Sequence, residues 1–424
     1  MKLPISSASG RSIPYIDALF TATTATCVTG LVTVVTSETW SLFGHVVILA
    51  LIQIGGLGVI TVVSIFLISL RRKITLFDRL LIQDAFNLNT LSGLVLFIKK
   101  VTLGTLAVEV MGAIAYMFVF VPEFGLKGIW VSVFTSVSAF CNAGIDIISS
   151  NSLCSYATNP VINVTTCLLI VLGGIGYIVW WDVVHTMKRF RIAGFRCFRQ
   201  LTLHSKIALF TTLALISGGA VCFFVFEYNN PATLLEHSLA DKIQIAVFQS
   251  VTTRTAGFAS VPQQELTNAS SVVTLLLMFI GGSPVGTAGG IKTVTLAVLL
   301  SSAFATVKNK NEISIYNRNI SAQAIRKAVA VVCMSFIIFT LSTLLLAAVT
   351  DAEVIDIFFE TVSATATVGL SRNLTSSLNI WGKIIIIATM YFGRIGPISL
   401  FIAFKTTKKN HNLIKNPIEE ISVG

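Results

Sequence analysis

The chain has 424 residues, of which 54% are apolar and 12% are charged. In soluble domains about a quarter of the residues are charged, so this composition excludes a soluble enzyme and indicates a polytopic helical membrane protein. The net charge of +11 would fit a nucleic-acid partner, but the basic residues lie between the apolar stretches, so no nucleic acid is expected. The seven cysteines and five histidines show no metal-ligand spacing, so we expect no cofactor in this chain.

Four short apolar segments recur along the chain, and each ends in a glycine. Gly30, Gly144, Gly257 and Gly369 are separated by 114, 113 and 112 positions. A period this regular indicates four copies of one unit. The expected fold class is an all-α polytopic membrane protein in which four tandem units of span, pore helix and span surround one central pore. The predicted units cover residues 1–92, 93–204, 205–325 and 326–424.

Two longer apolar runs, one leading and one trailing, flank each short segment, except that the first unit lacks the leading run. Few residues precede its short helix at Ile16, so its leading span is expected to be missing, through either a mis-assigned start or a true truncation. Lysine and arginine are concentrated after the trailing runs, so we expect those loops to be cytoplasmic. The opposite loops then face outward, and all four short helices are expected to enter the membrane from outside. The predicted leading runs are 93–121, 205–226 and 328–349, and the trailing runs are 42–70, 160–187, 272–306 and 380–404, followed by a cytoplasmic tail.

The four glycine turns are candidates for a selectivity filter. Non-helical backbone at membrane depth is tolerated only where it is buried in protein or lines water, so four such turns imply a shared cavity. Extended tripeptides that end in glycine can align successive carbonyls, and a ring of carbonyls replaces the water around a dehydrated cation such as potassium. A glycine that merely ends a helix is common, but four at nearly equal spacing favour the filter. The predicted filter residues are Val28, Thr29, Gly30, Asn142, Ala143, Gly144, Thr255, Ala256, Gly257, Thr367, Val368 and Gly369.

A glycine-rich interruption in the third trailing run is a candidate gate. Helices disfavour glycine by about 1 kcal/mol and proline by about 3 kcal/mol per site, so this stretch is expected to leave the helix and occupy the cavity below the filter. In the last trailing run, Arg394 takes the place of Gly56 and Gly174. A charge at membrane depth marks a pathway, so Arg394 is expected to bond the loop's carbonyls and repel cations. The predicted gate residues are Gly281, Gly282, Ser283, Pro284, Val285, Gly286, Thr287, Ala288, Gly289, Gly290, Lys292 and Arg394.

The motifs CVTGL, CNAGI, TRTAGF, ATVGL, IGGSPVGTAGGIKT and FGRIGP span the chain in order. With them the sequence resembles the Trk/Ktr/HKT superfamily of potassium transporters, most closely the Ktr membrane subunit. The resemblance implies a potassium-conducting pore subunit, multi-pass in the lipid of the cell membrane, of the bacterial inner-membrane type. It also implies a homodimer and a cytosolic regulatory ring that binds nucleotide on a separate subunit. Glycine at all four filter positions matches the potassium-selective members, and in the family the loop and the arginine form the constriction.

Two alternatives to a potassium pore stay open. One is a secondary cation transporter with broken helices, and the other is a sodium-conducting pore of the same family. An intramembrane enzyme would need a nucleophile with a base, or a metal cluster, and the apolar runs show neither, so no enzyme is expected.

Four charged residues in or beside the apolar segments are assigned structural roles. Arg254, beside the third turn, is expected to donate to nearby carbonyls, and Glu109 to be a buried hydrogen-bond partner. Asp17 and Asp356 each stand thirteen positions before a filter glycine, where an acid compensates the dipole of the short helix.

Overall fold

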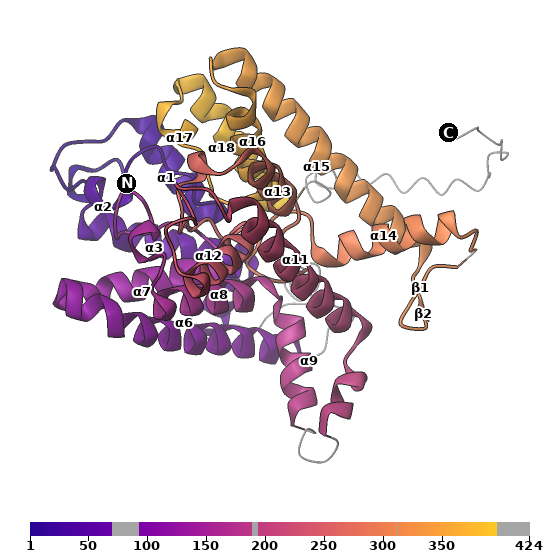
Figure 1. The fold of residues 1–424 in the computed structure, drawn as a ribbon. Coiled ribbons are helices and arrows are strands. Elements are labelled where there is room, and N and C mark those ends of the chain that lie inside the picture. The colour runs from indigo at the N-terminus through magenta and orange to yellow at the C-terminus, as the bar shows by residue number, and fades with distance from the viewer. Residues whose placement is uncertain (70–92, 189–193, 311, 397–424) are drawn as a thin grey trace, which may run out of the picture.

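The protein is a helical molecule with very little strand. The computed structural model describes residues 1–69, 93–188, 194–310 and 312–396, and the predicted C-terminal tail lies outside this part of the chain. Within the described ranges, strands are limited to a hairpin of β1 (Ser314–Ile315) and β2 (Arg318–Asn319), which projects away from the helices (Figure 1). The mostly helical character expected from the sequence is confirmed.

Three long helices match the predicted leading runs of the second, third and fourth units. They are α6 (Leu94–Phe124), α11 (Leu203–Glu227) and α15 (Ala322–Val349), and each is long and apolar enough to cross a membrane. The pair α8 (Pro160–Gly174) and α9 (Tyr177–Met187) passes the same test as one span, although it is bent by 101°.

Polar caps explain why several helices begin where they do. The side chain before the first helical residue accepts a hydrogen bond from a backbone N–H of the first turn, which has no partner within the helix. The capping residues are Ser41 for α3 (Leu42–Leu57), Asn159 for α8, Thr202 for α11, Ser238 for α12 (Leu239–Thr252), Thr267 for α13 (Asn268–Phe279), Ser321 for α15 and Asn379 for α18 (Ile380–Ile395).

The predicted trailing runs are broken rather than continuous. In the predicted first unit, Gly58 separates α3 (Leu42–Leu57) from α4 (Val59–Ser69), and in the predicted second unit Ile175 and Gly176 separate α8 from α9. In the fourth unit, α18 (Ile380–Ile395) ends before Gly396, and residues 397–404 of the predicted run lie outside the described part. The three glycines share one backbone conformation that other residues rarely adopt. Their φ values are 84°, 91° and 85°, and their ψ values are 138°, 137° and 135°.

The trailing run of the third unit contains a longer interruption. Here α13 (Asn268–Phe279) and α14 (Thr293–Val307) are joined by residues 280–292, which we call the central loop. The loop leaves the helix as the glycine content predicts.

Four short helices hold the predicted turns at their ends. They are α1 (Tyr15–Cys27), α7 (Leu126–Cys141), α12 (Leu239–Thr252) and α16 (Val354–Ala366). Hydroxyl groups connect three of them to the long helix that precedes each one, so the same packing recurs along the chain. Ser136 Oγ donates to Glu109 O at 2.6 Å, Ser250 Oγ to Ile216 O at 2.8 Å, and Thr343 Oγ1 lies 2.9 Å from Thr361 Oγ1.

Glycines on the broken helices permit close packing against the short ones. Gly55 on α3 lies so close to the C-terminal end of α1 that a methyl group would collide with a backbone carbonyl, and the same holds on α8 and α18. The pairs of glycine and carbonyl are Gly55 with Thr26, Gly173 with Phe140, and Gly393 with Thr365.

The remaining elements are short connections. They are η1 (Pro4–Ser6), α2 (Thr36–Thr39), η2 (Cys154–Tyr156), η3 (Gly194–Gln200), η4 (Gln263–Glu265) and α17 (Leu374–Ser377).

Candidate functional site

The turns after the four short helices share positive φ values at two matching positions. The expected positive φ is present at every glycine, with values of 100°, 62°, 85° and 97° along the chain. The residue two positions earlier is also left-handed rather than extended, which the sequence analysis did not anticipate. The left-handed residues are Val28, Asn142, Thr255 and Thr367, with φ between 51° and 64°.

A helix-ending motif accounts for the left-handed residue in the first, second and fourth turns, whereas in the third turn Thr253 and Arg254 lie between the end of α12 and Thr255. Such a residue lets the next backbone N–H return to a carbonyl of the last helical turn. The returning bonds are Thr29 N to Thr24 O at 2.9 Å, Ala143 N to Ser138 O at 2.8 Å, and Val368 N to Ser363 O at 2.8 Å.

The four glycines form a closed ring. A methyl group added to any of them would collide with the carbonyl of the next turn in chain order, and the fourth closes onto the first. The added carbon would lie 2.5 Å from Ala143 O for Gly30, 2.6 Å from Ala256 O for Gly144 and 2.5 Å from Val368 O for Gly257, and against Thr29 O for Gly369. The ring therefore has room for glycine alone.

Hydroxyl groups near the C-terminal ends of the short helices form hydrogen bonds with the backbone of each turn. Thr24 Oγ1 accepts from Gly30 N at 3.0 Å, and Ser363 Oγ accepts from Gly369 N at 2.9 Å. In the other two turns the hydroxyl donates one residue beyond the glycine. Ser138 Oγ donates to Ile145 O at 2.5 Å, and Thr252 Oγ1 to Phe258 O at 2.6 Å.

Cavities lie on both sides of the ring. A cavity of about 270 Å³ is lined by all four glycines and by residues that follow the turns, including Asp146. Burial raises the pKa of Asp146, and bonds from Ser152 and nearby backbone N–H groups partly offset this rise. Two cavities of about 320 and 580 Å³ adjoin residues that precede the turns, and both are lined by Gly286 and Arg394.

The central loop is attached to the bent helix pair α8 and α9. Ser283 N donates to Gly174 O at 2.8 Å, Thr287 N to Gly173 O at 3.0 Å, and Tyr177 N to Val285 O at 2.9 Å. The hydroxyl of Thr287 reaches the last turn of α7, where it donates to Phe140 O at 3.1 Å. These bonds hold the loop directly against the ends of the short helices.

Three basic side chains, those of Arg394, Lys292 and Arg254, donate hydrogen bonds to carbonyls of the central loop. Arg394 donates to Thr287 O at 2.6 Å, and its other terminal nitrogen donates to Gly55 O. Lys292 Nζ donates to Ala288 O at 2.6 Å. The contact predicted between Arg394 and the loop carbonyls is thus present.

Arg254 has the structural role that the sequence analysis assigned to it. Its guanidinium donates to Gly281 O at 2.9 Å and to Thr212 O at 3.5 Å. A side chain beside the third turn is therefore bonded to the first part of the central loop.

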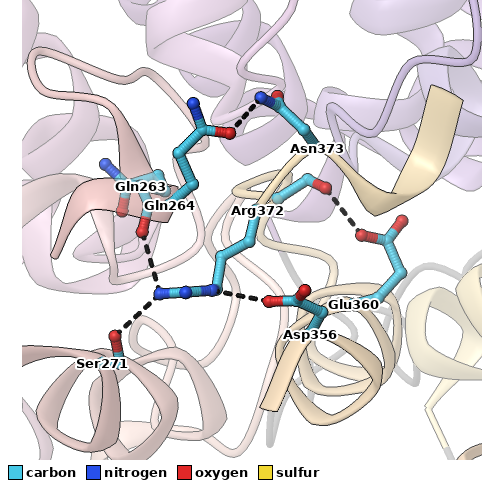
Figure 2. Close-up of polar contacts among 8 residues, drawn as sticks. Gln263, Gln264, Ser271, Asp356, Glu360, Arg372 and Asn373 are labelled. Carbon is cyan, nitrogen blue, oxygen red and sulfur yellow. Dashed lines mark hydrogen bonds and ion pairs between the residues drawn. The ribbon is translucent and has the colours of Figure 1, made fainter. Parts of the chain in front are cut away.

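The predicted structural acids are also paired. Glu109 accepts two bonds from Gln53 Nε2, at 3.1 and 3.2 Å, as a buried hydrogen-bond partner should. Asp17 and Asp356 lie in the first turns of α1 and α16 as expected. Their ion pairs were not predicted: Asp17 binds Lys383 at 2.6 Å and Asp356 binds Arg372 at 2.7 Å, the latter shown in Figure 2.

Comparisons with known proteins agree with this architecture. The sequence profile of the TrkH family, described as a cation transport protein, matches residues 1–415. The potassium/sodium uptake protein NtpJ of Enterococcus hirae is 37% identical, over all of this chain and 93% of that protein. The Ktr system potassium uptake protein B of Bacillus subtilis is 39% identical, over all of this chain and 92% of that protein.

A solved structure shares the fold. The potassium transporter TrkH from Vibrio parahaemolyticus superimposes with a TM-score of 0.73 at 17% identity, covering 93% of this chain and 79% of that chain. Together with the full-length relatives, this shows that the chain belongs to the TrkH family of cation transport proteins.

Proposed function

We propose that this protein takes up potassium ions across the bacterial cell membrane through a filter made of the four glycine turns. The observation that carries the proposal is the closed ring, in which each glycine faces the carbonyl of the next turn. A ring of backbone carbonyls can replace the hydration shell of a cation without any side-chain charge. The twelve predicted filter residues, from Val28 to Gly369, would provide it.

Potassium is favoured by two further points. No filter position carries a hydroxyl in place of the glycine, and three relatives are named as potassium uptake proteins. Sodium conduction is the second candidate, because another relative is named a potassium/sodium uptake protein.

The gate would be the central loop with Arg394. The bonds from Arg394 to Thr287 O and Gly55 O connect the loop to the first unit, and Lys292 adds a second positive charge beside the same loop. A loop in this position narrows the pathway, and the guanidinium repels cations there.

The assembly would follow the Ktr pattern. Four units, predicted at 1–92, 93–204, 205–325 and 326–424, would surround the pore in each chain of a homodimer. Several relatives are named as parts of a Ktr system, which supports a separate cytosolic ring as the regulator. Nucleotide would bind to that ring and not to this chain.

Uptake in a host tests the function. Expression in a bacterial strain without potassium uptake of its own should restore growth at low external potassium and the uptake of labelled rubidium. Uptake of sodium that is unaffected by potassium would favour the second candidate. Correctly inserted protein that moves neither ion would contradict the proposal.

A further inference from the structure

Glu360, in the middle of the fourth short helix α16, is a carboxyl group with no exposed surface. Within the described ranges, no lysine or arginine lies within ion-pair distance of it. A buried carboxylate without a cationic partner is unfavourable unless hydrogen bonds satisfy it. Its partners therefore indicate its purpose.

Both partners of Glu360 are hydroxyl groups beyond the fourth glycine turn. Ser371 Oγ donates to one carboxyl oxygen at 2.8 Å, and Thr375 Oγ1 donates to the other at 2.6 Å. Ser371 and Thr375 follow Gly369 by two and six positions. The carboxyl group thus ties the chain after the turn to the helix before it.

The opposite side of the same segment is fixed by Arg372. Its guanidinium pairs with Asp356, one turn before Glu360 on α16, and also donates to Gln263 O at 3.3 Å and Ser271 Oγ at 3.1 Å (Figure 2). Asp356 is the ionic partner of Arg372, which leaves Glu360 to the two hydroxyl groups.

The third unit has an uncharged equivalent of this arrangement. Gln249 stands eight positions before Gly257 on α12, and Gln263 stands six positions after it. Their amides bond reciprocally, at 2.7 and 3.2 Å. The pairing of α12 with the segment after its turn therefore repeats in the fourth unit, but with a carboxyl group in place of an amide.

The first two units lack such a connection. Their residues nine positions before the glycine are Thr21 and Thr135. The Thr21 hydroxyl bonds Asp17 O in its own helix, and the Thr135 hydroxyl has no hydrogen-bond partner among the described residues. At this position, the fourth short helix thus has a connection to the segment after its turn that the first and second short helices lack.

We propose that Glu360 is a positioning residue for the fourth turn, and that through Ser371 and Thr375 it sets the discrimination between potassium and sodium. This rests on the filter function proposed above. Carbonyls that differ little in position coordinate one monovalent cation better than another, so the segment that holds Gly369 determines how well the ring fits the larger ion.

Substitutions that remove one or both hydrogen bonds test this role. Glu360→Ala removes both hydrogen bonds and should lower the ratio of potassium to sodium uptake by about tenfold. Glu360→Gln should retain a ratio within about twofold of the original, because an amide makes the equivalent contact in the third unit. Thr375→Val, nearly isosteric, should lower the ratio by about threefold.

A matched control separates positioning from general loss of stability. Thr389 on α18 is also buried, and its hydroxyl lies 2.8 Å from Ser342 Oγ on α15, so this bond does not involve the segment after a turn. Thr389→Val should leave the ratio unchanged. If Glu360→Ala does not assemble, Thr375→Val decides the outcome. An unchanged ratio in assembled Thr375→Val, or an equal fall in Thr389→Val, would overturn the proposal, whereas a wild-type chain that moves no potassium would refute the filter itself.

Discussion

The ring of four glycine turns and the central loop are built in opposite ways. Each turn has a left-handed residue two positions before its glycine and a hydroxyl bond from its own short helix. Among the described residues, no other trailing run has an interruption as long as the central loop, whose bonds reach α7, α8 and α18.

This contrast is consistent with the proposed division, in which the ring selects the ion and the loop controls its passage. A ring made of repeated parts presents similar groups on four sides, which suits the coordination of one ion. A loop held by single contacts from several elements can change position when one contact is lost, which suits a gate. The predictions below test whether the two regions can be altered independently.

The largest effect is expected in the ring. Gly369→Ser places a side chain at φ 97° and against Thr29 O, so potassium uptake should fall by about tenfold or more. Gly218→Ser is the matched control, because this exposed glycine on α11 has no atom within 4 Å of the added carbon. Labelled rubidium uptake, normalised to membrane-inserted protein, measures both. Equal losses in the two variants would argue against a ring function.

The second effect, expected in the opposite direction, concerns Arg394. Arg394→Ala removes two bonds and a positive charge beside the central loop, and two unit charges about 4 Å apart interact by roughly 4 kcal/mol at an effective dielectric of about 20. Flux through reconstituted vesicles should therefore rise. Arg394→Lys keeps the charge and should stay closer to the original flux. A fall in flux that follows loss of assembled protein would instead make Arg394 a structural anchor.

A smaller rise is expected from Thr287→Val. This nearly isosteric change removes the bond to Phe140 O, a loss of about 0.5–1.5 kcal/mol, and should raise flux by about threefold. Thr306→Val makes the same change on α14, where the exposed hydroxyl bonds only Ser302 O in its own helix. Flux that rises in neither variant would show that this bond does not hold the loop.

The features that could be predicted from the sequence are mostly those of the repeated glycine turns. The glycine period and the positive φ are local properties that repeat, so they could be recognised from residue order alone. Arg394 could be recognised because a charge interrupts a glycine pattern that its equivalents keep. The carbonyls it bonds could be predicted only as belonging to the loop.

Other features depend on partners that are remote in the sequence. Lys383 pairs with Asp17 from 366 positions away, and no local pattern connects them. The left-handed residue at the start of each turn was missed because Val28 and Thr367 are residue types that rarely adopt positive φ. Glu360 stood within an apolar run, and its position nine residues before a filter glycine was the signal that could have drawn attention to it.

The smallest effect is expected for Asp146, in the cavity of about 270 Å³ that the four glycines line. Asp146 lines that cavity two positions after Gly144, and its equivalents are Val32, Ala259 and Ser371. At a dielectric of about 80 and a separation of about 6 Å, one carboxylate attracts a monovalent cation by about 0.7 kcal/mol. Asp146→Asn should therefore raise the KM for potassium by about threefold without changing the maximal rate.

External pH provides the check on Asp146. Since burial raises the pKa of Asp146, its negative charge is lost at a higher pH than in an ordinary aspartate, and the wild-type KM should rise as external pH falls through that value. Cys154 lines the same cavity, but burial and the nearby Asp146 raise its pKa to about 11, so its thiol stays neutral in this range. In Asp146→Asn the KM should no longer depend on external pH. A pH dependence that persists in this variant would assign the titration to another group and leave Asp146 with a local structural role, through its bonds with Ser152 and nearby backbone N–H groups.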